Sequence, residues 1–321
     1  MDLVRASHLY KVFGKHEREV IERLKAGESR EDLASLGTAA VIDVSLEVAK
    51  GETFVVMGLS GSGKSTLIRM INGLWAPSEG TVEVAGKVVS DMNDSQLREL
   101  RRDHVSMVFQ HFALLPHLTV RENAAYGLKL QGKLKPKDRL EKANEWLHTV
   151  GLKGWGDKYP HQLSGGMQQR VGLARALAAE TDILLMDEAF SALDPLIRRE
   201  MQDQLLELQG TLNKTIIFIT HDLNEAMYLG DHIAVMRNGR VAQIGTSDEI
   251  LTQPADDYVA DFVQDVDRSR VLTASAVMRP TEAVVSRSAD PRRVQRIMDQ
   301  RDWAGVFVVD EHRRLLGMVG D

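Results

Sequence analysis

The sequence contains no cysteine among its 321 residues, which excludes disulfides, thiolate nucleophiles and cysteine-ligated zinc. It has no excess of positive charge, because 40 Lys and Arg stand against 46 Asp and Glu, so no nucleic-acid partner is expected. No apolar run approaches the roughly 18 residues of a membrane span, and the N-terminus lacks the apolar segment of a signal peptide. The remaining composition, 43% hydrophobic and 27% charged, is typical of a folded globular protein of about two domains.

Four short apolar segments alternate with helical patterns and predict a mostly parallel sheet covered by helices. These segments are 53–57, 105–109, 183–186 and 215–219. Polar or glycine-rich residues follow each of them: Gly58, Gln110, Asp187 with Glu188, and Thr220 with His221. Because ligands bind at the carboxyl edge of parallel strands, we expect the functional site of an α/β fold at this edge.

The N-terminal region has a different pattern. Residues 9–14 predict a short strand and turn, and residues 42–48 alternate as in a half-buried strand. Between them, the charged stretch from Lys15 to about Gly37 predicts two short helices. The first has an apolar face and the second has capping-box-like spacing at residues 29–32.

A phosphate-binding loop is the strongest single motif. It matches G-x-x-x-x-G-K-[ST] after a strand and before a helix, and comprises Gly58, Ser60, Gly61, Ser62, Gly63, Lys64, Ser65 and Thr66. Its backbone N–H groups and the helix N-terminus are expected to bind phosphate oxygens, with Lys64 on the terminal phosphates and Ser65 on Mg²⁺.

Two further features indicate phosphoryl transfer to water. The strand ending in Asp187 and Glu188 predicts one carboxylate for the metal and one for polarising the attacking water. A second glycine-rich helix start, at residues 163–169, predicts a second anion site.

With these motifs, the sequence resembles the ATP-binding cassette (ABC) ATPases over residues 7–265. The resemblance implies an ABC cassette with antiparallel β and helical subdomains, ATP and Mg²⁺ as cofactors, and a head-to-tail homodimer that sandwiches each ATP. For catalysis it implies Glu188 as base, His221 as switch histidine and Gln110 as Q-loop glutamine beside Lys64. The implied metal residues are Ser65, Gln110 and Asp187. The implied nucleotide contacts outside the phosphate loop are Phe13, Ser164, Gly165, Gly166, Gln168 and Asp194.

The resemblance also implies how the chain is divided. Residues 1–267 would form the cassette, with a helical insertion at about 15–40 and a helical subdomain at about 112–180. Residues 268–321 would form an incomplete CBS-like module, because residues 276–280 and the β-α-β-β pattern after them resemble its start.

The insertion and this module resemble those of ATPases that drive importers of glycine betaine, proline betaine or choline. The resemblance implies permease subunits as direct partners and a substrate-binding protein as an indirect one. It also implies a peripheral location on the cytoplasmic face of the inner membrane. The apolar segment 111–118, with Phe112 and Leu115, is the expected permease contact.

Alternatives are an importer ATPase for another small polar solute, such as an amino acid, and a soluble non-transport ABC ATPase. The soluble class needs a coiled-coil insertion or a second cassette, and neither is present. A P-loop kinase or GTPase would lack residues 163–168.

Overall fold

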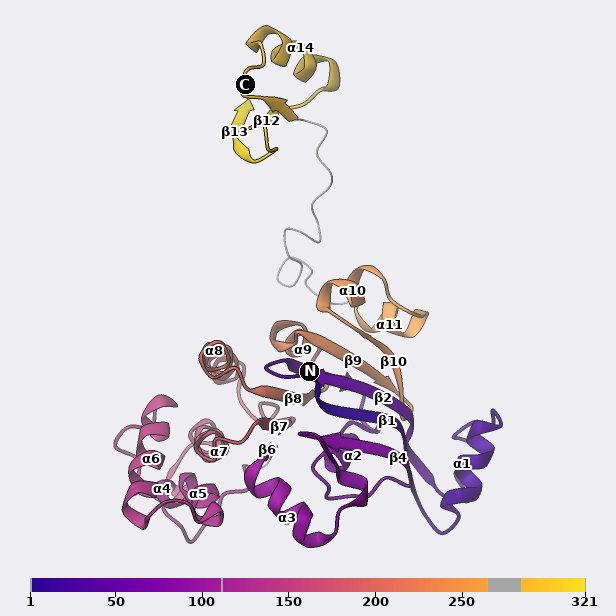
Figure 1. The fold of residues 1–321 in the computed structure, drawn as a ribbon, viewed down its shortest axis with the longest axis vertical. Helices are drawn as coiled ribbons and strands as arrows, with labels where there is room; N and C mark the ends of the chain where they lie inside the picture. Colours follow the sequence, from indigo (N-terminus) through magenta and orange to yellow (C-terminus); the bar gives the residue numbers. More distant parts are fainter. Residues whose placement is uncertain (1, 111, 265–283, 321) are drawn as a thin grey trace. The chain divides into compact units, whose positions relative to one another are not determined.

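The computed structural model describes residues 2–110, 112–264 and 284–320. The chain divides into two compact units, Met1–Val271 and Leu272–Asp321 (Figure 1). Each unit is described by itself.

The first unit contains a six-stranded sheet in the order β10-β9-β3-β8-β7-β6. All neighbouring strands run parallel except β10, which is antiparallel to β9. The strands are β3 (Thr53–Gly58), β6 (Val105–Phe109), β7 (Ile183–Asp187), β8 (Thr215–Thr220), β9 (His232–Arg237) and β10 (Arg240–Gly245). The four predicted parallel strands are confirmed, and every residue of the central strands β3 and β8 is buried. Strands β9 and β10 were not predicted.

An antiparallel sheet of order β2-β1-β4-β5 completes the β structure of this unit. Its strands are β1 (Asp2–Phe13), β2 (Thr38–Ala49), β4 (Glu79–Val84) and β5 (Lys87–Val88). The predicted alternation in β2 is confirmed from Ile42 to Val48, although both β1 and β2 are longer than expected. Helix α2 (Lys64–Ile71) shares one apolar core with strands of both sheets, which fixes the start of this helix against the end of β3.

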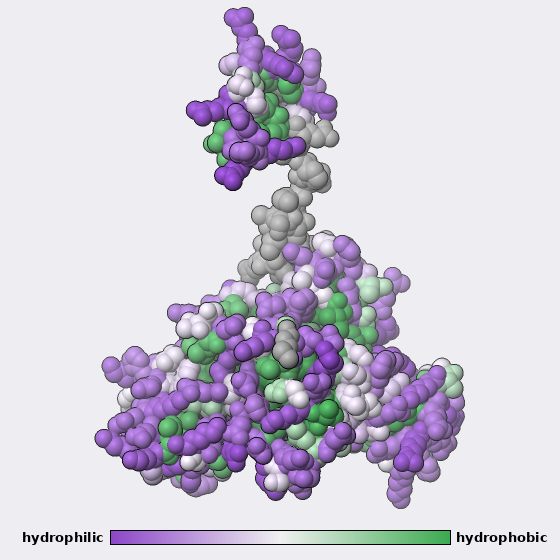
Figure 2. Space-filling model, in the orientation of Figure 1, coloured by the Kyte–Doolittle hydropathy of each residue, from purple (hydrophilic) through white to green (hydrophobic). Residues whose placement is uncertain are grey.

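Helices surround the sheets in Figure 1. Their outer faces on α1 and α6 are largely hydrophilic in Figure 2. The α-helices are α1 (Glu17–Lys25), α3 (Asp94–Asp103), α4 (Val120–Ala124), α5 (Tyr126–Gln131), α6 (Pro136–Thr149), α7 (Gly165–Ala178), α8 (Pro195–Leu212), α9 (Leu223–Leu229), α10 (Ser247–Thr252) and α11 (Asp257–Phe262). Short 3-10 helices cover Val89–Asp91 and Pro160–Gln162. Among the described residues, no helix combines the length and apolar character that crossing a bilayer requires.

Of the two helices predicted for the N-terminal insertion, one is present. Helix α1 forms as expected, and its apolar residues Val20, Ile21 and Leu24 are buried. The second predicted helix is wrong, because residues 30–36 form turns. The Ser29 hydroxyl donates to the Asp32 carboxylate at 2.6 Å, and the Asp32 N–H donates back to Ser29 Oγ at 3.2 Å. Such local side-chain bonds compete with a helix, and so short a segment cannot offset the cost of helix nucleation by itself.

The second unit has the predicted β-α-β-β order: β11 (Val284–Ser286), α14 (Pro291–Arg301), β12 (Gly305–Val309) and β13 (Leu315–Gly320). Strand β12 is parallel to β11 and antiparallel to β13. Val294, Met298 and Val306 form its small core, with Val285 and Trp303 packed against them. The predicted module start at residues 276–280 lies outside the described residues.

Candidate functional site

The loop between β3 and α2 adopts a conformation that only glycine accommodates well. Gly58, Gly61 and Gly63 all have positive φ, at 148°, 77° and 103°. A Cβ on Gly58 would stand 2.2 Å from the Met236 carbonyl oxygen, and one on Gly63 would stand 2.2 Å from that of Ala40. Both the backbone angle and the space therefore require glycine at these two positions.

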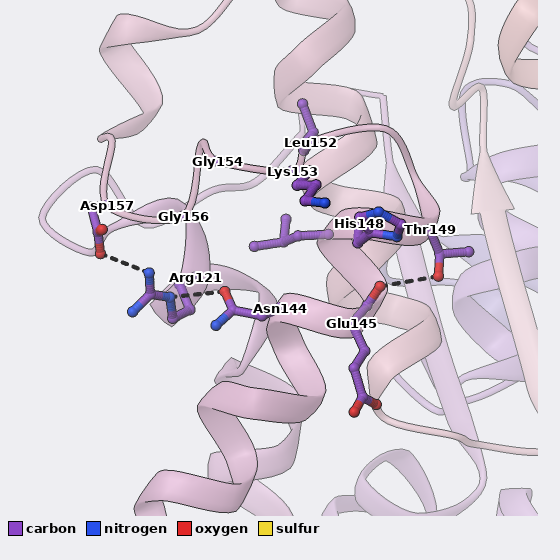
Figure 3. A pocket seen from close by; sticks show the side chains of 11 residues that line it. Arg121, Asn144, Glu145, His148, Thr149, Leu152, Lys153, Gly154, Gly156 and Asp157 are labelled. Carbon is purple, nitrogen blue, oxygen red and sulfur yellow. Dashed lines mark hydrogen bonds and ion pairs between the residues drawn. The ribbon is translucent and has the colours of Figure 1, made fainter.

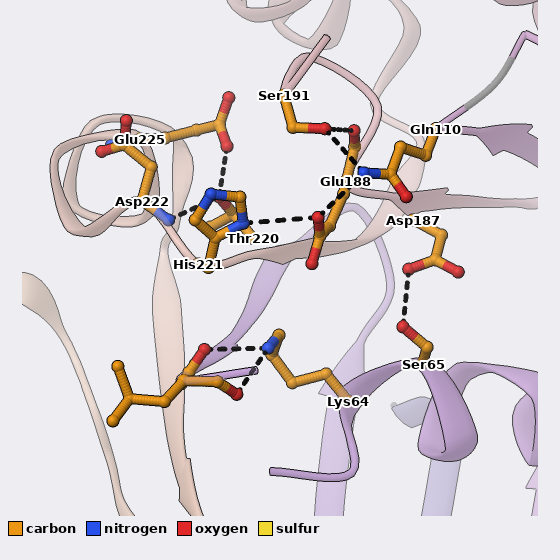
Figure 4. Close-up of polar contacts among 12 residues, drawn as sticks. Lys64, Ser65, Gln110, Asp187, Glu188, Ser191, Thr220, His221, Asp222 and Glu225 are labelled. Carbon is orange, nitrogen blue, oxygen red and sulfur yellow. Dashed lines mark hydrogen bonds and ion pairs between the residues drawn. The ribbon is translucent and has the colours of Figure 1, made fainter. Parts of the chain in front are cut away.

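Lys64 opens α2 and is buried. Its ammonium donates to the carbonyl oxygens of Gly58 at 2.8 Å and Leu59 at 3.1 Å, so it lies across the loop (Figure 4). Burial lowers the pKa of Lys64, while the nearby charges of Glu188 and Asp187 act in the opposite direction.

Asp187 ends β7 beside the loop. The Ser65 hydroxyl donates to Asp187 Oδ1 at 3.1 Å, which joins the first turn of α2 to the neighbouring strand (Figure 4). Burial raises the pKa of Asp187, and the Ser65 hydrogen bond partly offsets this shift. The hydroxyl and carboxylate oxygens are hard ligands of the kind that Mg²⁺ prefers.

Glu188 lies where the residues that follow β6, β7 and β8 come together. Gln110, after β6, donates from Nε2 to Glu188 Oε2 at 3.3 Å, and His221 Nδ1, after β8, lies 3.3 Å from the same oxygen. The Glu188 N–H donates to the Ile219 carbonyl at 3.0 Å while its φ is 46°, in the left-handed region. The side chains predicted from three separate strand ends thus meet at one carboxylate (Figure 4).

Several supporting contacts were not predicted from the sequence. Ser191 accepts a hydrogen bond from Gln110 at 3.2 Å and donates to the Glu188 carbonyl at 2.9 Å. On α9, which follows His221, the buried Glu225 carboxylate accepts hydrogen bonds from Thr220 and from Gln202, the latter at 3.0 Å. Burial raises the pKa of Glu225. A polar residue inside a helical pattern gives no signal that its partner lies on another helix.

Phe13 ends β1 with 37% of its surface exposed. Its ring meets Trp75 edge to face at a centroid distance of 5.1 Å, and the Lys11 ammonium lies 5.3 Å from its centroid. Phe13 thus places a partly exposed ring at the end of a strand of the antiparallel sheet, and an exposed aromatic ring can stack on a base.

The second predicted anion site forms the start of α7. Ser164 is the N-cap, with its Oγ accepting from the Met167 N–H at 3.3 Å, and Gln168 Nε2 donates to the Leu163 carbonyl at 3.2 Å. A Cβ on Gly166 would stand 2.7 Å from Ile197 Cγ2 of α8, so glycine permits this helix contact. Within the described residues, no hydrogen bond joins Ser164, Gly165, Gly166 or Gln168 to the phosphate loop.

Two further polar contacts involve α8 and the last turn of α7. Asp194 caps α8 by accepting from the Ile197 N–H at 3.1 Å. Arg175 of α7 donates to the carbonyls of Phe112 at 3.0 Å and Ala113 at 2.6 Å, so it joins α7 to the chain after Gln110. Phe112 and Leu115 are half-buried, and His111 lies outside the described residues.

A cavity of about 610 Å³ lies elsewhere, in the helical region around α6 (Figure 3). Arg121 crosses it, bonded to Asn144 and Asp157 at 2.9 Å each. None of the predicted site residues lines this cavity.

Comparison with known proteins agrees with the geometry. The profile of the ABC transporter family matches residues 41–191. The glycine betaine transport ATP-binding protein OpuAA of Bacillus subtilis is 50% identical over 98% of this chain and 76% of its own length. The glycine betaine/carnitine transport ATP-binding protein GbuA of Listeria monocytogenes is 52% identical over 99% of this chain and 81% of its own length.

A solved structure is similar as well. The dimeric post-hydrolysis state of the ATP-binding cassette MJ0796, bound to ADP and Pi, gives a TM-score of 0.65 at 32% identity, covering 76% of this chain and 98% of that one. Together with the motif geometry, these similarities establish that the chain belongs to the ABC transporter family, among its ATP-binding ATPase proteins.

Proposed function

We propose that the protein is the ATP-hydrolysing subunit of an importer for a quaternary-amine osmolyte, such as glycine betaine, proline betaine or choline. The observation that supports hydrolysis is the meeting of Gln110, Glu188 and His221 beside Lys64 and Asp187. The relatives' described transport of glycine betaine supports the solute class.

The phosphate loop, residues 58–66, would bind the triphosphate. Its backbone N–H groups and the positive end of α2 attract phosphate oxygens. Lys64 would exchange the carbonyls of Gly58 and Leu59 for the terminal phosphates, since an ammonium gains more from an anion than from a neutral carbonyl. Phe13 would stack on the adenine.

The residues present fit a magnesium ion, held by Ser65 and Asp187 with Gln110 nearby. When bound, the ion would neutralise charge on the terminal phosphates. The Ser65–Asp187 hydrogen bond keeps these two oxygens together at 3.1 Å before any ligand arrives.

Glu188 would act as the general base. It removes a proton from a water whose oxygen bonds to the terminal phosphorus, while the bond from that phosphorus to the bridging oxygen of ADP breaks. The products are ADP and inorganic phosphate. Gln110 and His221, both within 3.3 Å of the Glu188 carboxylate, would hold it in position, and His221 would contact the terminal phosphate.

A head-to-tail homodimer would complete each site. Ser164, Gly165, Gly166, Gln168 and Asp194 of one subunit would close over the nucleotide held by the partner. This arrangement explains why the start of α7 carries anion-binding N–H groups away from the phosphate loop of its own chain.

Permease subunits would hold the protein at the cytoplasmic face of the inner membrane, and a substrate-binding protein would act indirectly. The segment 111–118, in which Phe112 and Leu115 are half-buried, is the proposed contact. We further propose that residues 1–267 form the cassette and that residues 268–321 form an incomplete CBS-like module. An importer ATPase for another small polar solute, such as an amino acid, is the second candidate.

Transport reconstitution tests the proposal. The chain would be combined with its permease and binding protein in vesicles and supplied with radiolabelled glycine betaine, choline, proline, carnitine or an unrelated amino acid. We expect ATP-dependent uptake of a quaternary amine. Uptake of the amino acid alone would favour the second candidate, and ATP hydrolysis with no uptake of any solute would contradict an importer.

A further inference from the structure

The N-terminal insertion begins and ends at the proposed nucleotide site. Gly14 and Gly37 lie back to back, because a Cβ on Gly14 would be 3.0 Å from Gly37 Cα and 3.1 Å from the Leu36 carbonyl oxygen. The chain therefore leaves directly after Phe13 and returns directly before Thr38. Its returning end, residues 37–39, lines a cavity together with Ser60 and Gly61 of the phosphate loop.

The returning part of the insertion is fixed in place. Leu33 is fully buried and belongs to the same apolar cluster as Tyr10, Val12 and the buried face of α1. The turn just before it is closed by the two hydrogen bonds between Ser29 and Asp32. Arg30 lies inside this turn, so its backbone is positioned by both the turn and the Leu33 anchor.

Arg30 reaches the phosphate loop. Its Nη1 lies 3.5 Å from the Gly61 carbonyl oxygen, across 31 residues of sequence. Beside this contact is an open cavity of about 400 Å³. Arg30, Glu31, Thr38, Ser60, Gly61 and Asn238 are among its lining residues.

The Arg30 guanidinium has unused binding capacity. Among the described residues it makes no ion pair, and the Gly61 carbonyl is its one hydrogen-bond acceptor. Arg23 in the same insertion is different, because it is paired with Glu28 at 2.7 Å and with Glu19 at 3.6 Å. Glu31 also lines the cavity, yet it forms no ion pair with Arg30 in the structure.

We propose that Arg30 binds the phosphate chain of the nucleotide held by residues 58–66, so that the insertion is part of the nucleotide site. A guanidinium stays charged at any physiological pH and offers five N–H donors, which suits phosphate oxygens. The inference rests on the proposed function of the loop. It adds a contact from outside the loop, supplied by a segment that the phosphate-loop motif does not include.

Nucleotide titration calorimetry on the full chain tests this contact. Arg30→Gln is expected to weaken binding of ATP and ADP by roughly five- to twentyfold, since a charge-assisted hydrogen bond is lost at a partly exposed position. Binding of adenosine is expected to stay unchanged. Because the lost interaction is ionic, ATP affinity should also fall less steeply with added NaCl in Arg30→Gln than in the parent chain.

Two variants make the test specific. Arg18→Gln removes the same charge from the exposed side of α1 and is expected to bind ATP like the parent. Arg30→Lys keeps the charge and is expected to retain most of the affinity. Equal loss in Arg18→Gln and Arg30→Gln, or equal loss for ATP and adenosine, would overturn the proposal.

Lys64→Ala separates this proposal from the one it rests on. Loss of ATP affinity in Lys64→Ala with none in Arg30→Gln overturns the role of Arg30 alone. Unchanged affinity in both variants overturns the proposed loop function as well. Melting curves of each variant verify that the fold is retained, and Arg30→Ala, which also removes the charge, replaces Arg30→Gln if that variant does not fold.

Discussion

The two predicted anion sites of the cassette differ in how completely one chain builds them. At the phosphate loop, side chains from α2 and from the ends of β6, β7 and β8 are joined by hydrogen bonds and by a 3.3 Å contact of His221 with Glu188. At the start of α7, the hydrogen bonds that the described residues give to the side chains of Ser164 and Gln168 stay within their own turn. One region has its chemical groups assembled before any ligand arrives, whereas in the part of the chain that the structure describes the other shows no hydrogen bond to the phosphate loop. The difference is the one that the proposed head-to-tail dimer predicts, in which each chain would hold one prepared site and contribute to a second.

Removing the carboxylate at the centre of the prepared site is expected to have the largest effect. Glu188→Gln should lower ATP turnover by about a hundredfold or more, the amount that a positioned general base supplies, while ATP affinity is kept. Phosphate release and calorimetric binding measure the two quantities. Glu207→Gln, an exposed carboxylate on α8, is the matched control. A turnover within about threefold of the parent would remove Glu188 from this role.

Lys64→Ala should disturb the same site at an earlier step. Without the ammonium, ATP affinity is expected to fall by about tenfold or more, because charge-assisted bonds to the terminal phosphates are lost. Calorimetry with ATP and with adenosine measures this, and adenosine binding should change little. If ATP bound to Lys64→Ala as tightly as to the parent, the prepared site would not be the phosphate site.

Mixing mutants sharpens the comparison between the two regions. Ser164→Arg chains and Lys64→Ala chains should each be inactive alone. Their mixture should recover about a quarter of parental ATPase activity, since random pairing makes half the dimers mixed and each mixed dimer has one intact composite site. Recovery at a concentration where ATP-dependent dimers form would support a site shared between subunits. A mixture as inactive as its components would point to a site contained in one chain.

A smaller effect, on the pH dependence of stability, is expected at the buried carboxylate Glu225. Burial raises the pKa of Glu225 above its ordinary value, so its proton is held more tightly in the folded chain than in the unfolded one. The corresponding stability is fully present below the unfolded pKa and is lost as pH rises through the folded pKa. Glu225→Gln has no such loss. The melting temperature of Glu225→Gln minus that of the parent should therefore increase from pH 4 to pH 8.

The surface variant Glu207→Gln again supplies the control for that series, because its carboxylate is exposed. A melting-temperature difference for Glu225→Gln that stays constant over the pH range would contradict a raised pKa at this position.

The prepared site was predictable because its parts obey local rules. Apolar runs ending in polar residues located β3, β6, β7 and β8 and aligned Gln110, Asp187 and His221 along one edge. The pairing of Glu225 with Gln202 could not be predicted, since it depends on how α8 packs against α9. The contact of Arg30 with Gly61 depends similarly on the insertion folding back across 31 residues.

The incorrect helix at residues 30–36 has a comparable cause. Its spacing matched a helix-start pattern, but Ser29 and Asp32 hydrogen-bond to each other and Leu33 is buried in a turn. Burial against other parts of the chain determines the local conformation here, and the local sequence pattern carries no information about that burial.

The left-handed backbone at Glu188 has a consequence for evolution of the fold. A non-glycine residue in this conformation costs about 1–2 kcal/mol, and glycine would avoid that cost at the expense of about 0.5–1 kcal/mol of extra chain entropy. If Glu188 is the general base as proposed, the chain accepts lower stability to place this carboxylate, which is a trade between stability and activity. Glu188→Gly should be inactive yet melt at or slightly above the parental temperature, which would make catalytically dead cassettes easy for the fold to tolerate.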